Sequence, residues 1–218
     1  MSLLVLKKGL KWQWNKVLHI PNQKEFSMND LYTFFNNISP IQAHTWAKLE
    51  VLFTEQTLNK GEYFISEGAL AKKFGFLQEG IIRAFYRNSS GQEYNKHFFI
   101  ENSLVGGFSS LISQQPNLIN QQALTDCKLL VGDYKKLIDL LDEHQDLERL
   151  LRKIAEYYFV DKEKREVEIV LLEANKRYEI FQSDYPQLEQ RIPQYHIASY
   201  LGITPTQLSR IRSQNSKA

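Results

Sequence analysis

The sequence predicts an α+β fold in which a β-rich first half is followed by helices. Between residues 57 and 133, short segments rich in β-branched and aromatic side chains alternate with glycine-containing turns. Strands at this spacing form an antiparallel sandwich or barrel. After Tyr134 the apolar residues recur at intervals of three and four, and no Gly or Pro occurs before Tyr185. That pattern predicts long helices.

The composition excludes several classes of protein. With 218 residues, of which 43% are hydrophobic and 24% charged, the chain has ordinary globular values and room for one or two domains. Apolar runs such as residues 3–6 and 169–172 are far shorter than the roughly 20 residues of a membrane-spanning helix, and the first is too short for a secretory signal. Cys127 is the only cysteine, which excludes an internal disulfide, a thiolate zinc site and a four-cysteine iron–sulfur cluster. We expect a cytoplasmic protein with no membrane contact and no cofactor.

Residues 1–27 differ from the rest of the chain in charge, because five lysines stand against the single acidic residue Glu25. One interpretation is a basic arm that contacts phosphate or anionic lipid. The other is an extension that is non-native or disordered and has no role. We favour the second, because a coherent helical pattern begins only at Met28. The five lysines are Lys7, Lys8, Lys11, Lys16 and Lys24.

The first predicted unit covers residues 28–145. Apolar residues at helix spacing predict helices from residue 28 to about residue 56, with a break at Ser39 and Pro40. A short helix around residues 137–141 completes the unit. Between these helices, strands bounded by turn signals are expected at residues 63–66, 74–78, 81–87, 93–100, 121–125 and 128–133.

A long helix is expected over residues 146–175. Its apolar residues form a stripe, and a helix of this length is longer than one small domain needs. We expect the stripe to form a coiled-coil-like seam between two copies of the chain, which makes the protein a homodimer. The alternative is that the stripe packs on the chain's own β unit. The expected seam residues are Leu147, Leu150, Leu151, Ile154, Tyr157 and Tyr158.

The C-terminal region holds the strongest motif, which is a helix, a glycine turn and a second, capped helix. Pro193 suits the first turn of a helix, and Gly202 stands where a helix end needs a positive φ. Thr204 is placed to cap the second helix, with Pro205 as its first residue and Gln207 completing a capping box. This arrangement is a helix-turn-helix, whose second helix fits the major groove of DNA.

The charge distribution supports DNA binding by residues 176–218. No Asp or Glu follows Glu189, while four basic residues do, so an anion is the expected partner. In the major groove, Arg pairs with guanine and Gln with adenine. The alternative is an ordinary helical hairpin with a solvated face. The expected DNA-binding residues are Thr204, Pro205, Thr206, Gln207, Ser209, Arg210 and Arg212.

These features together resemble the Crp–Fnr superfamily of bacterial transcription regulators, with special similarity to Bacteroidetes-type members. The motifs that carry the resemblance are residues 58–62 (Leu-Asn-Lys-Gly-Glu), 76–80 (Phe-Leu-Gln-Glu-Gly) and 192–212. The resemblance implies a cyclic-nucleotide-binding-like jelly roll, a dimerisation helix and a helix-turn-helix of the winged type. It also implies double-stranded DNA as the partner, with RNA polymerase as a further candidate partner.

The helix-turn-helix departs from the superfamily pattern in two ways. The resemblance implies base contacts at Pro205, Thr206 and Arg210. Many members carry Glu where this chain has Thr206, so a different base preference is expected there. The sequence ends six residues after Arg212, which leaves room for little or no wing.

The effector pocket departs further. In cyclic-nucleotide sensors of this superfamily, one Arg neutralises the phosphate and one Glu accepts a hydrogen bond from the ribose. Gly107 stands where that Glu would be and Asn117 where the Arg would be, and no Arg occurs from Asn88 to Glu148. Because a buried phosphodiester needs a paired cation, and Lys does not pair in a bidentate way, we expect no response to cyclic AMP in the usual mode. The effector is then an unknown small molecule or none. The expected pocket residues are Gly106, Gly107, Phe108, Ser109 and Ser110.

Other functions fit the sequence less well. Metal-dependent oxygenase chemistry on a jelly roll needs clustered ligands, but the five histidines are scattered, and His44, His97 and His144 are isolated. Neither a Walker sequence nor Gly-x-Ser-x-Gly occurs. We therefore expect a DNA-binding regulator and not an enzyme. The alternative is a ligand-binding or scaffold module that has lost sequence-specific DNA binding.

Overall fold

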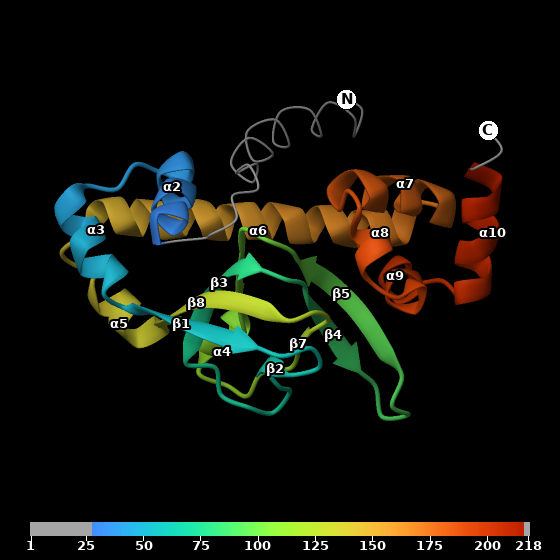
Figure 1. Ribbon diagram of the computed structural model, residues 1–218, viewed down its shortest axis with the longest axis horizontal. Coiled ribbons are helices and arrows are strands. Elements are labelled where there is room, and N and C mark those ends of the chain that lie inside the picture. The colour runs from blue at the N-terminus through green and yellow to red at the C-terminus, as the bar shows by residue number, and fades with distance from the viewer. Residues whose placement is uncertain (1–27, 216–218) are drawn as a thin grey trace.

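The computed structural model describes residues 28–215, so the predicted basic extension lies outside the described residues. Figure 1 shows that a long helix, α6 (Gln145–Leu171), runs along most of the molecule. The strands lie on one side of α6, the N-terminal helices at one of its ends and the C-terminal helices at the other. This arrangement confirms the predicted α+β class, with a jelly roll, a long helix and a helical C-terminal region.

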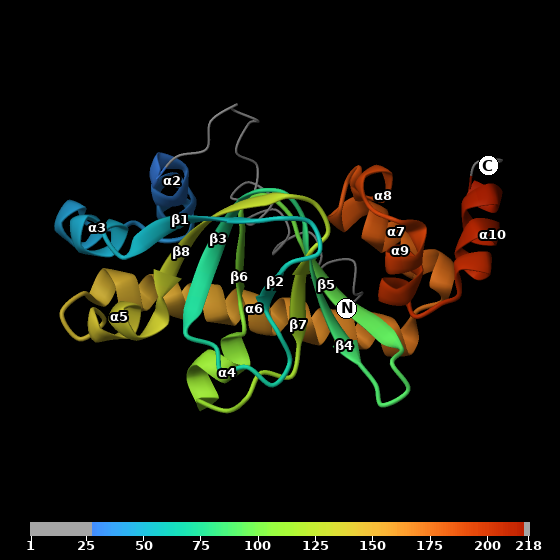
Figure 2. The ribbon, with the colours of Figure 1, turned by 60° about the horizontal axis from the view of Figure 1, so that its bottom comes forward.

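Two four-stranded antiparallel sheets form the jelly roll (Figure 2), with the strand orders β1-β8-β3-β6 and β2-β7-β4-β5. Their facing sides are apolar, and Leu77, Ile82 and Leu129 are fully buried between them. The strands are β1 (Phe53–Leu58), β2 (Tyr63–Ile65), β3 (Lys73–Glu79), β4 (Ile82–Arg87), β5 (Glu93–Phe99), β6 (Ser103–Gly106), β7 (Asn120–Ala123) and β8 (Cys127–Asp133).

The prediction of helix up to about residue 56 is wrong. Helix α3 (Ala43–Glu50) ends first, and β1 begins at Phe53. All of β1 pairs with β8, from Phe53 opposite Gly132 to Leu58 opposite Cys127. The apolar spacing of these residues is compatible with a continuing helix, but pairing with the distant strand β8 determines their structure.

The N-terminal helices and the first half of α6 share one apolar core with the jelly roll. Helix α2 (Met28–Ile38) buries Leu31 and Phe34 against Phe76 and Leu130 of the sheet. The shorter helices α4 (Phe108–Ser113) and α5 (Tyr134–Asp139) flank the roll. From α6 the core receives Leu147, Leu150 and Ile154, with Leu151 and Tyr158 packed against it.

This packing corrects the expected dimer seam. Leu147, Leu150 and Ile154 are buried within the chain itself, so they complete its own core and do not form a face that a second copy can reach. The alternative, that the stripe packs on the chain's own β unit, therefore holds for this half of α6. Tyr157 is half-buried on the same helix.

Four helices form the C-terminal region, and their core is continuous with the jelly roll. Phe181, Ile197 and Leu208 pack in one cluster with Ile81 and Phe98 of the roll. Residues 176–215 contain no strand. Among all described residues, no helix has both the length and the apolar character of a membrane-spanning segment. The helices are α7 (Ala174–Asp184), α8 (Leu188–Arg191), α9 (Gln194–Leu201) and α10 (Pro205–Asn215).

Candidate nucleic-acid interface

Helix α9 ends at a glycine, as the sequence predicts. Gly202 has a φ of +68°, the left-handed conformation that favours glycine. The N–H of Gly202 donates to the Ser199 carbonyl at 3.2 Å, and the N–H of Ile203 donates to the Ala198 carbonyl at 3.0 Å. These bonds close the helix end and fix the direction in which the chain leaves it.

Helix α10 begins with the predicted cap. The Gln207 N–H donates to Thr204 Oγ1 at 3.2 Å, and Pro205 is the first helical residue, where its missing N–H is no loss. The start of α9 differs slightly from the prediction, because Pro193 precedes the helix as its cap residue and Gln194 is the first helical residue.

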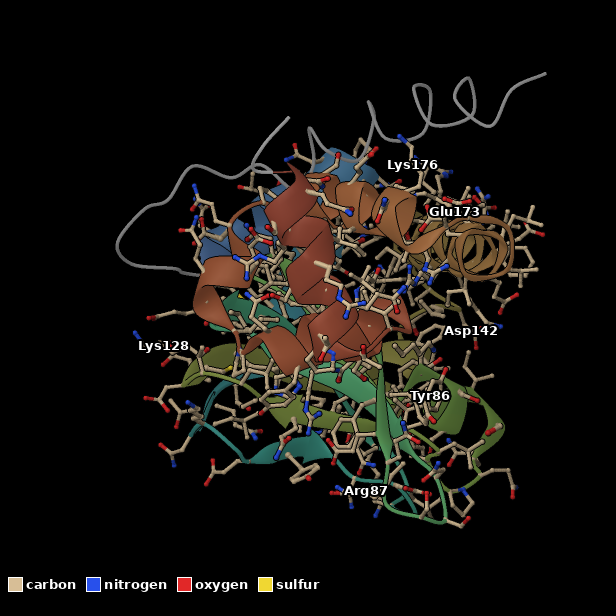
Figure 3. All side chains as sticks on the ribbon, turned by 90° about the vertical axis from the view of Figure 1, so that its right-hand side faces the viewer. Tyr86, Arg87, Lys128, Asp142, Glu173 and Lys176 are labelled. Carbon is tan, nitrogen blue, oxygen red and sulfur yellow. The ribbon has the colours of Figure 1, made fainter. Side chains whose placement is uncertain are left out.

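One face of α10 packs inward and the other is exposed. Leu208 and Ile211 are buried in the C-terminal core, so the residues around them project outward. Figure 3 views the molecule from the end that carries α10, which lies at the surface. Six of the seven predicted DNA-binding residues are exposed here: Thr204, Pro205, Thr206, Gln207, Ser209 and Arg210.

The seventh predicted residue, Arg212, lies differently. It is only half-exposed, and it interacts with Tyr178 of α7, whose hydroxyl donates to Glu189 Oε2 at 2.7 Å. Burial, followed by the bond to Glu189, raises the pKa of Tyr178 to about 12. Arg212 therefore turns toward its own helices, which corrects the expectation that it faces outward.

Two arginines from other helices hold the C-terminal end of α9. Arg165 of α6 donates to the Tyr200 carbonyl and places its guanidinium 3.9 Å from the centre of the Tyr200 ring. Arg177 of α7 donates through Nε to the Leu201 carbonyl at 3.0 Å. Cations at a helix C-terminus satisfy its free carbonyls and its negative end, so α9 is fixed to both neighbouring helices.

An aromatic cluster joins the other side of α9 to the jelly roll. Phe98 of β5 contacts Phe181, Tyr185 and Tyr200, with ring centres between 5.4 and 6.3 Å apart. Beside this cluster, Ser199 Oγ accepts from the Asn95 N–H and donates to a β5 carbonyl, both at 3.0 Å. The helix-turn-helix therefore sits directly on strand β5.

Arg191 is also tied to the jelly roll. Its guanidinium bonds both carboxylate oxygens of Glu101, with Nη1 3.0 Å from Oε2. Burial alone raises the pKa of Glu101, but the bonds and charge of Arg191 outweigh burial and lower it. Of the basic residues after Glu189, Arg191 is therefore directed at the chain itself, whereas Arg210 faces solvent.

The predicted effector residues lie at the end of β6 and the start of α4, where polar groups of Gly106 and Ser110 bond to other parts of the chain. The Gly106 N–H donates to Gln121 Oε1 at 3.1 Å, and Gln121 Nε2 returns a bond to the Gly106 carbonyl at 2.7 Å. Ser110 Oγ accepts from the Ala71 N–H at 3.1 Å and donates to the Gln115 carbonyl. Phe108 is half-exposed and Ser109 is exposed.

Gly107 has close neighbours on the side where a side chain would lie. A Cβ at this position lies 2.9 Å from Asn117 Oδ1 and 3.0 Å from Ile65 Cδ1. Asn117 itself donates through Nδ2 to the Ile119 carbonyl. Gly107 therefore has close side-chain neighbours, and the Nδ2 of Asn117 is used for bonding within the chain.

A polar recess of about 470 Å³ lies beside the start of α10. It opens between the first residues of α7 and the turn that precedes α10. Arg177 supplies its cationic side chain. Among the described residues, no cluster of His, Cys, Asp and Glu side chains has the arrangement of a metal site. The recess is lined by Glu173, Ala174, Asn175, Arg177, Gly202, Ile203 and Gln207.

Known proteins are similar first to the jelly roll and then to most of the chain. Residues 55–144 match the family of cyclic nucleotide-binding domains. No curated protein matches the sequence. Among solved structures, FixK2 from Bradyrhizobium japonicum is similar with a TM-score of 0.67 and 18% identity, over 76% of this chain and 85% of that one.

Two solved structures of regulators are also similar to the chain. CLP from Xanthomonas campestris, a global regulator that responds to c-di-GMP, has a TM-score of 0.63 and 16% identity, over 81% of this chain and 92% of its own. A Crp/Fnr-family regulator from Eubacterium rectale has a TM-score of 0.64 and 14% identity, over 81% and 85%. Residues 55–144 are therefore similar to cyclic nucleotide-binding domains, and the chain shares its overall fold with these solved structures, one of which is described as a Crp/Fnr-family regulator.

Proposed function

We propose that this protein is a DNA-binding transcription regulator that acts as a homodimer and does not respond to cyclic AMP in the usual mode. The observation that supports this most directly is the exposed face of α10. Arg210 projects from a capped helix there among neutral hydrogen-bonding side chains. Thr206 and Arg210 are four residues apart and so share a face. Among residues 28–215, several arginines form ion pairs with carboxylates, and Arg210 is not one of them.

An exposed helix of this kind fits the major groove of DNA, where Arg pairs with guanine through two hydrogen bonds. Arg210 is the side chain best placed for that pairing. The recess beside α10 is lined by Glu173 as well as Arg177, and Arg177 already donates to the Leu201 and Leu172 carbonyls, so we assign no phosphate contact to it. In this arrangement the exposed face of α10 specifies the DNA sequence.

The dimer is expected to use the second half of α6, because apolar side chains remain uncovered there. Phe159 is 67% exposed and Val170 79% exposed. They lie 11 residues apart, which is about three helical turns, so they fall on one stripe. A second copy of the chain is the natural cover for such a stripe. Figure 1 shows the jelly roll on one side of α6, and the partner helix is expected along the exposed stripe.

The effector region supports the second part of the proposal. A cyclic nucleotide of the usual mode needs a cation for its phosphate and a carboxylate for its ribose, and Gly107 and Asn117 supply neither. The polar groups of Gly106 and Ser110 are already bonded within the chain. We therefore propose that this domain holds α6 and the C-terminal helices in place and does not report cyclic AMP.

Selection from random DNA with the purified full-length chain tests this function. We expect a roughly two-fold symmetric site whose half-sites lie about 34 Å apart, one turn of the duplex, with one α10 per half-site. Affinity should fall steeply with salt because phosphate contacts release counterions. Enrichment of no sequence, with only salt-sensitive binding to any duplex, would favour the alternative of a scaffold module. A melting shift of several degrees in excess cyclic AMP would contradict the second part.

A further inference from the structure

A second set of contacts joins the jelly roll to the helix-turn-helix, and it is polar and buried. Arg83 of β4 pairs with Glu93 of β5, with Nη1 2.7 Å from Oε2. It also donates twice to Gln122 Oε1, at 3.1 and 2.7 Å, and its guanidinium lies 3.8 Å from the centre of the Phe85 ring. A buried arginine with this many partners has one fixed position.

Asn95 and His196 extend this set onto α9. Asn95 Nδ2 donates to the His196 carbonyl at 2.9 Å, and because a carbonyl only accepts, this bond fixes the orientation of the amide. His196 Nδ1 then lies 3.4 Å from Arg83 Nη1 and 3.3 Å from Asn95 Nδ2. Both neighbours are donors, so Nδ1 must accept and the ring must be neutral, with its proton on Nε2.

Protonation of His196 opposes this arrangement. A proton on Nδ1 would place an N–H against two donors, one of them the Arg83 guanidinium. Burial, followed by the charge of Arg83, lowers the pKa of His196 to about 4, although Glu93 acts in the opposite direction. Arg83 on β4 and Glu93 on β5 are the charged groups that act on the ring from the jelly roll. On its own helix, the ring contacts Tyr195.

We propose that Arg83, Glu93, Asn95, His196 and Ser199 form a latch between the jelly roll and the DNA-reading helices, closed while His196 is neutral and opened when His196 takes a proton. The closed latch holds α9 on β5. Because α10 shares its core with α9, the latch also fixes the position of α10. None of these five residues lies on the exposed face of α10, so the latch controls the orientation of the reading helix and not its chemistry.

The consequence for DNA rests on the function proposed above. Two reading helices must lie about 34 Å apart to enter successive grooves of one duplex. A latched α10 keeps a fixed spacing from its copy in the dimer, whereas a released α10 samples many spacings and loses affinity. DNA binding by this chain is then coupled to acidification through a contact that includes none of the predicted effector residues.

Hydrogen exchange of the full-length chain, followed by mass spectrometry, tests the latch without DNA. The amides to follow are those of residues 194–201, which leave out β5 and its own buried His97, after correction for the intrinsic effect of pH on exchange. A histidine with a pKa of about 4 in the closed latch and 6.5 when released favours release about 30-fold more at pH 5.0 than at pH 7.5. We expect protection of these amides to fall by up to about 30-fold over that change.

Two variants make the test specific. His196→Asn keeps an acceptor close to the position of Nδ1 but does not titrate, so its protection should fall by less than about threefold between the two pH values. Asn95→Ala removes donors to the ring and to the His196 carbonyl, so residues 194–201 should lose protection already at pH 7.5. Equal pH responses of the wild type and His196→Asn would overturn the proposal. So would unchanged protection of residues 194–201 in Asn95→Ala.

A second arm uses fluorescence anisotropy with the DNA site obtained by selection. We expect acidification from pH 7.5 to pH 5.5 to weaken binding several-fold more in the wild type than in His196→Asn. If the exchange experiment gives the expected results but the chain binds no DNA, the latch is supported and the proposed function is contradicted. If the chain binds DNA but the wild type and the variants show the same exchange, the proposed function is supported and the latch is contradicted.

Discussion

The two halves of α6 carry similar apolar residues but use them differently. In the first half, Leu147, Leu150 and Ile154 are buried under α2 and against the sheet. In the second half, Phe159 and Val170 are mostly exposed, and the side of the helix that faces the chain carries polar and charged groups such as Arg165 and Glu168. An apolar stripe on a helix therefore does not show whether it packs in the chain's own core or against a second copy. The elements that cover it decide, and here α2 covers only the beginning.

The largest expected effect sharpens the first half of this comparison. Leu150→Ala should lower the free energy of unfolding by about 2–5 kcal/mol, because it removes a fully buried side chain and leaves a cavity. Urea denaturation measures the change. Val51→Ala, at an apolar residue that is 73% exposed, serves as the control and should change stability by less than about 0.5 kcal/mol. A cost below 1 kcal/mol at Leu150 would mean that α2 does not cover α6 in solution.

Substitutions in the second half of α6 should change the affinity of the dimer and not the stability of the fold. Phe159→Glu places a charge in the proposed seam of the dimer, opposite the same charge of the second copy. We expect the dissociation constant of the dimer to rise at least about 100-fold, about 2.7 kcal/mol, as measured by sedimentation equilibrium. Leu150→Ala should remain dimeric where it is folded. If Phe159→Glu stays dimeric at the wild-type concentration, the seam lies elsewhere.

The same distinction between inward and outward side chains separates the two arginines of α10. Arg210→Ala should cost roughly 1–3 kcal/mol on the preferred DNA site and relax the preference at one base pair per half-site. Arg212→Ala should instead weaken the packing around Tyr178 and affect all DNA sequences alike. Competition binding at fixed salt, with single-base variants of the site, distinguishes the two. A uniform loss for Arg210→Ala would make Arg210 a phosphate contact.

The smallest expected effect is a dependence of stability on pH between 7 and 6. Burial, followed by nearby cations, lowers the pKa of His97 to about 4, and that of His196 is also about 4. A lowered pKa means that the unfolded state binds the proton more tightly, so stability is complete above the ordinary value of 6.5 and falls as pH drops from 6.5 toward 4. Between pH 7 and pH 6 the loss is on the order of 0.5 kcal/mol for each histidine. Melting temperatures of His97→Gln and His196→Asn, compared with the wild type at both pH values, measure it, and an unchanged slope in both variants would contradict it.

Much of the fold was predictable because its signals are local. The strands of the roll are short and bounded by turns, and the helix-turn-helix is marked at its turn by Gly202 and Thr204. The edge strand β1 was not predictable, because its ladder with β8 joins residues such as Thr57 and Lys128 that have no local relation. Its apolar residues therefore looked like the end of a helix.

The candidate site divides in the same way. The exposed face of α10 follows from helical periodicity, so the exposure of Thr206 and Arg210 was predictable from the sequence alone. The contact between Arg83 and His196 joins residues 113 positions apart, and neither residue carries a motif. The inward turn of Arg212 was missed because it depends on Tyr178 of a different helix.

The shared core of the C-terminal helices has a consequence for how such a chain can be recombined. Ile81 and Phe98 of the roll lie in the same cluster as Ile197, Leu208 and Ile211. A tail cut at residue 176 leaves the first two of these behind and exposes the apolar surface that they cover. A chimera that transfers the C-terminal helices to another jelly roll must therefore bring the β4–β5 hairpin with them. The exchangeable module of this protein is a discontinuous set of segments, assembled in space and interrupted in the sequence.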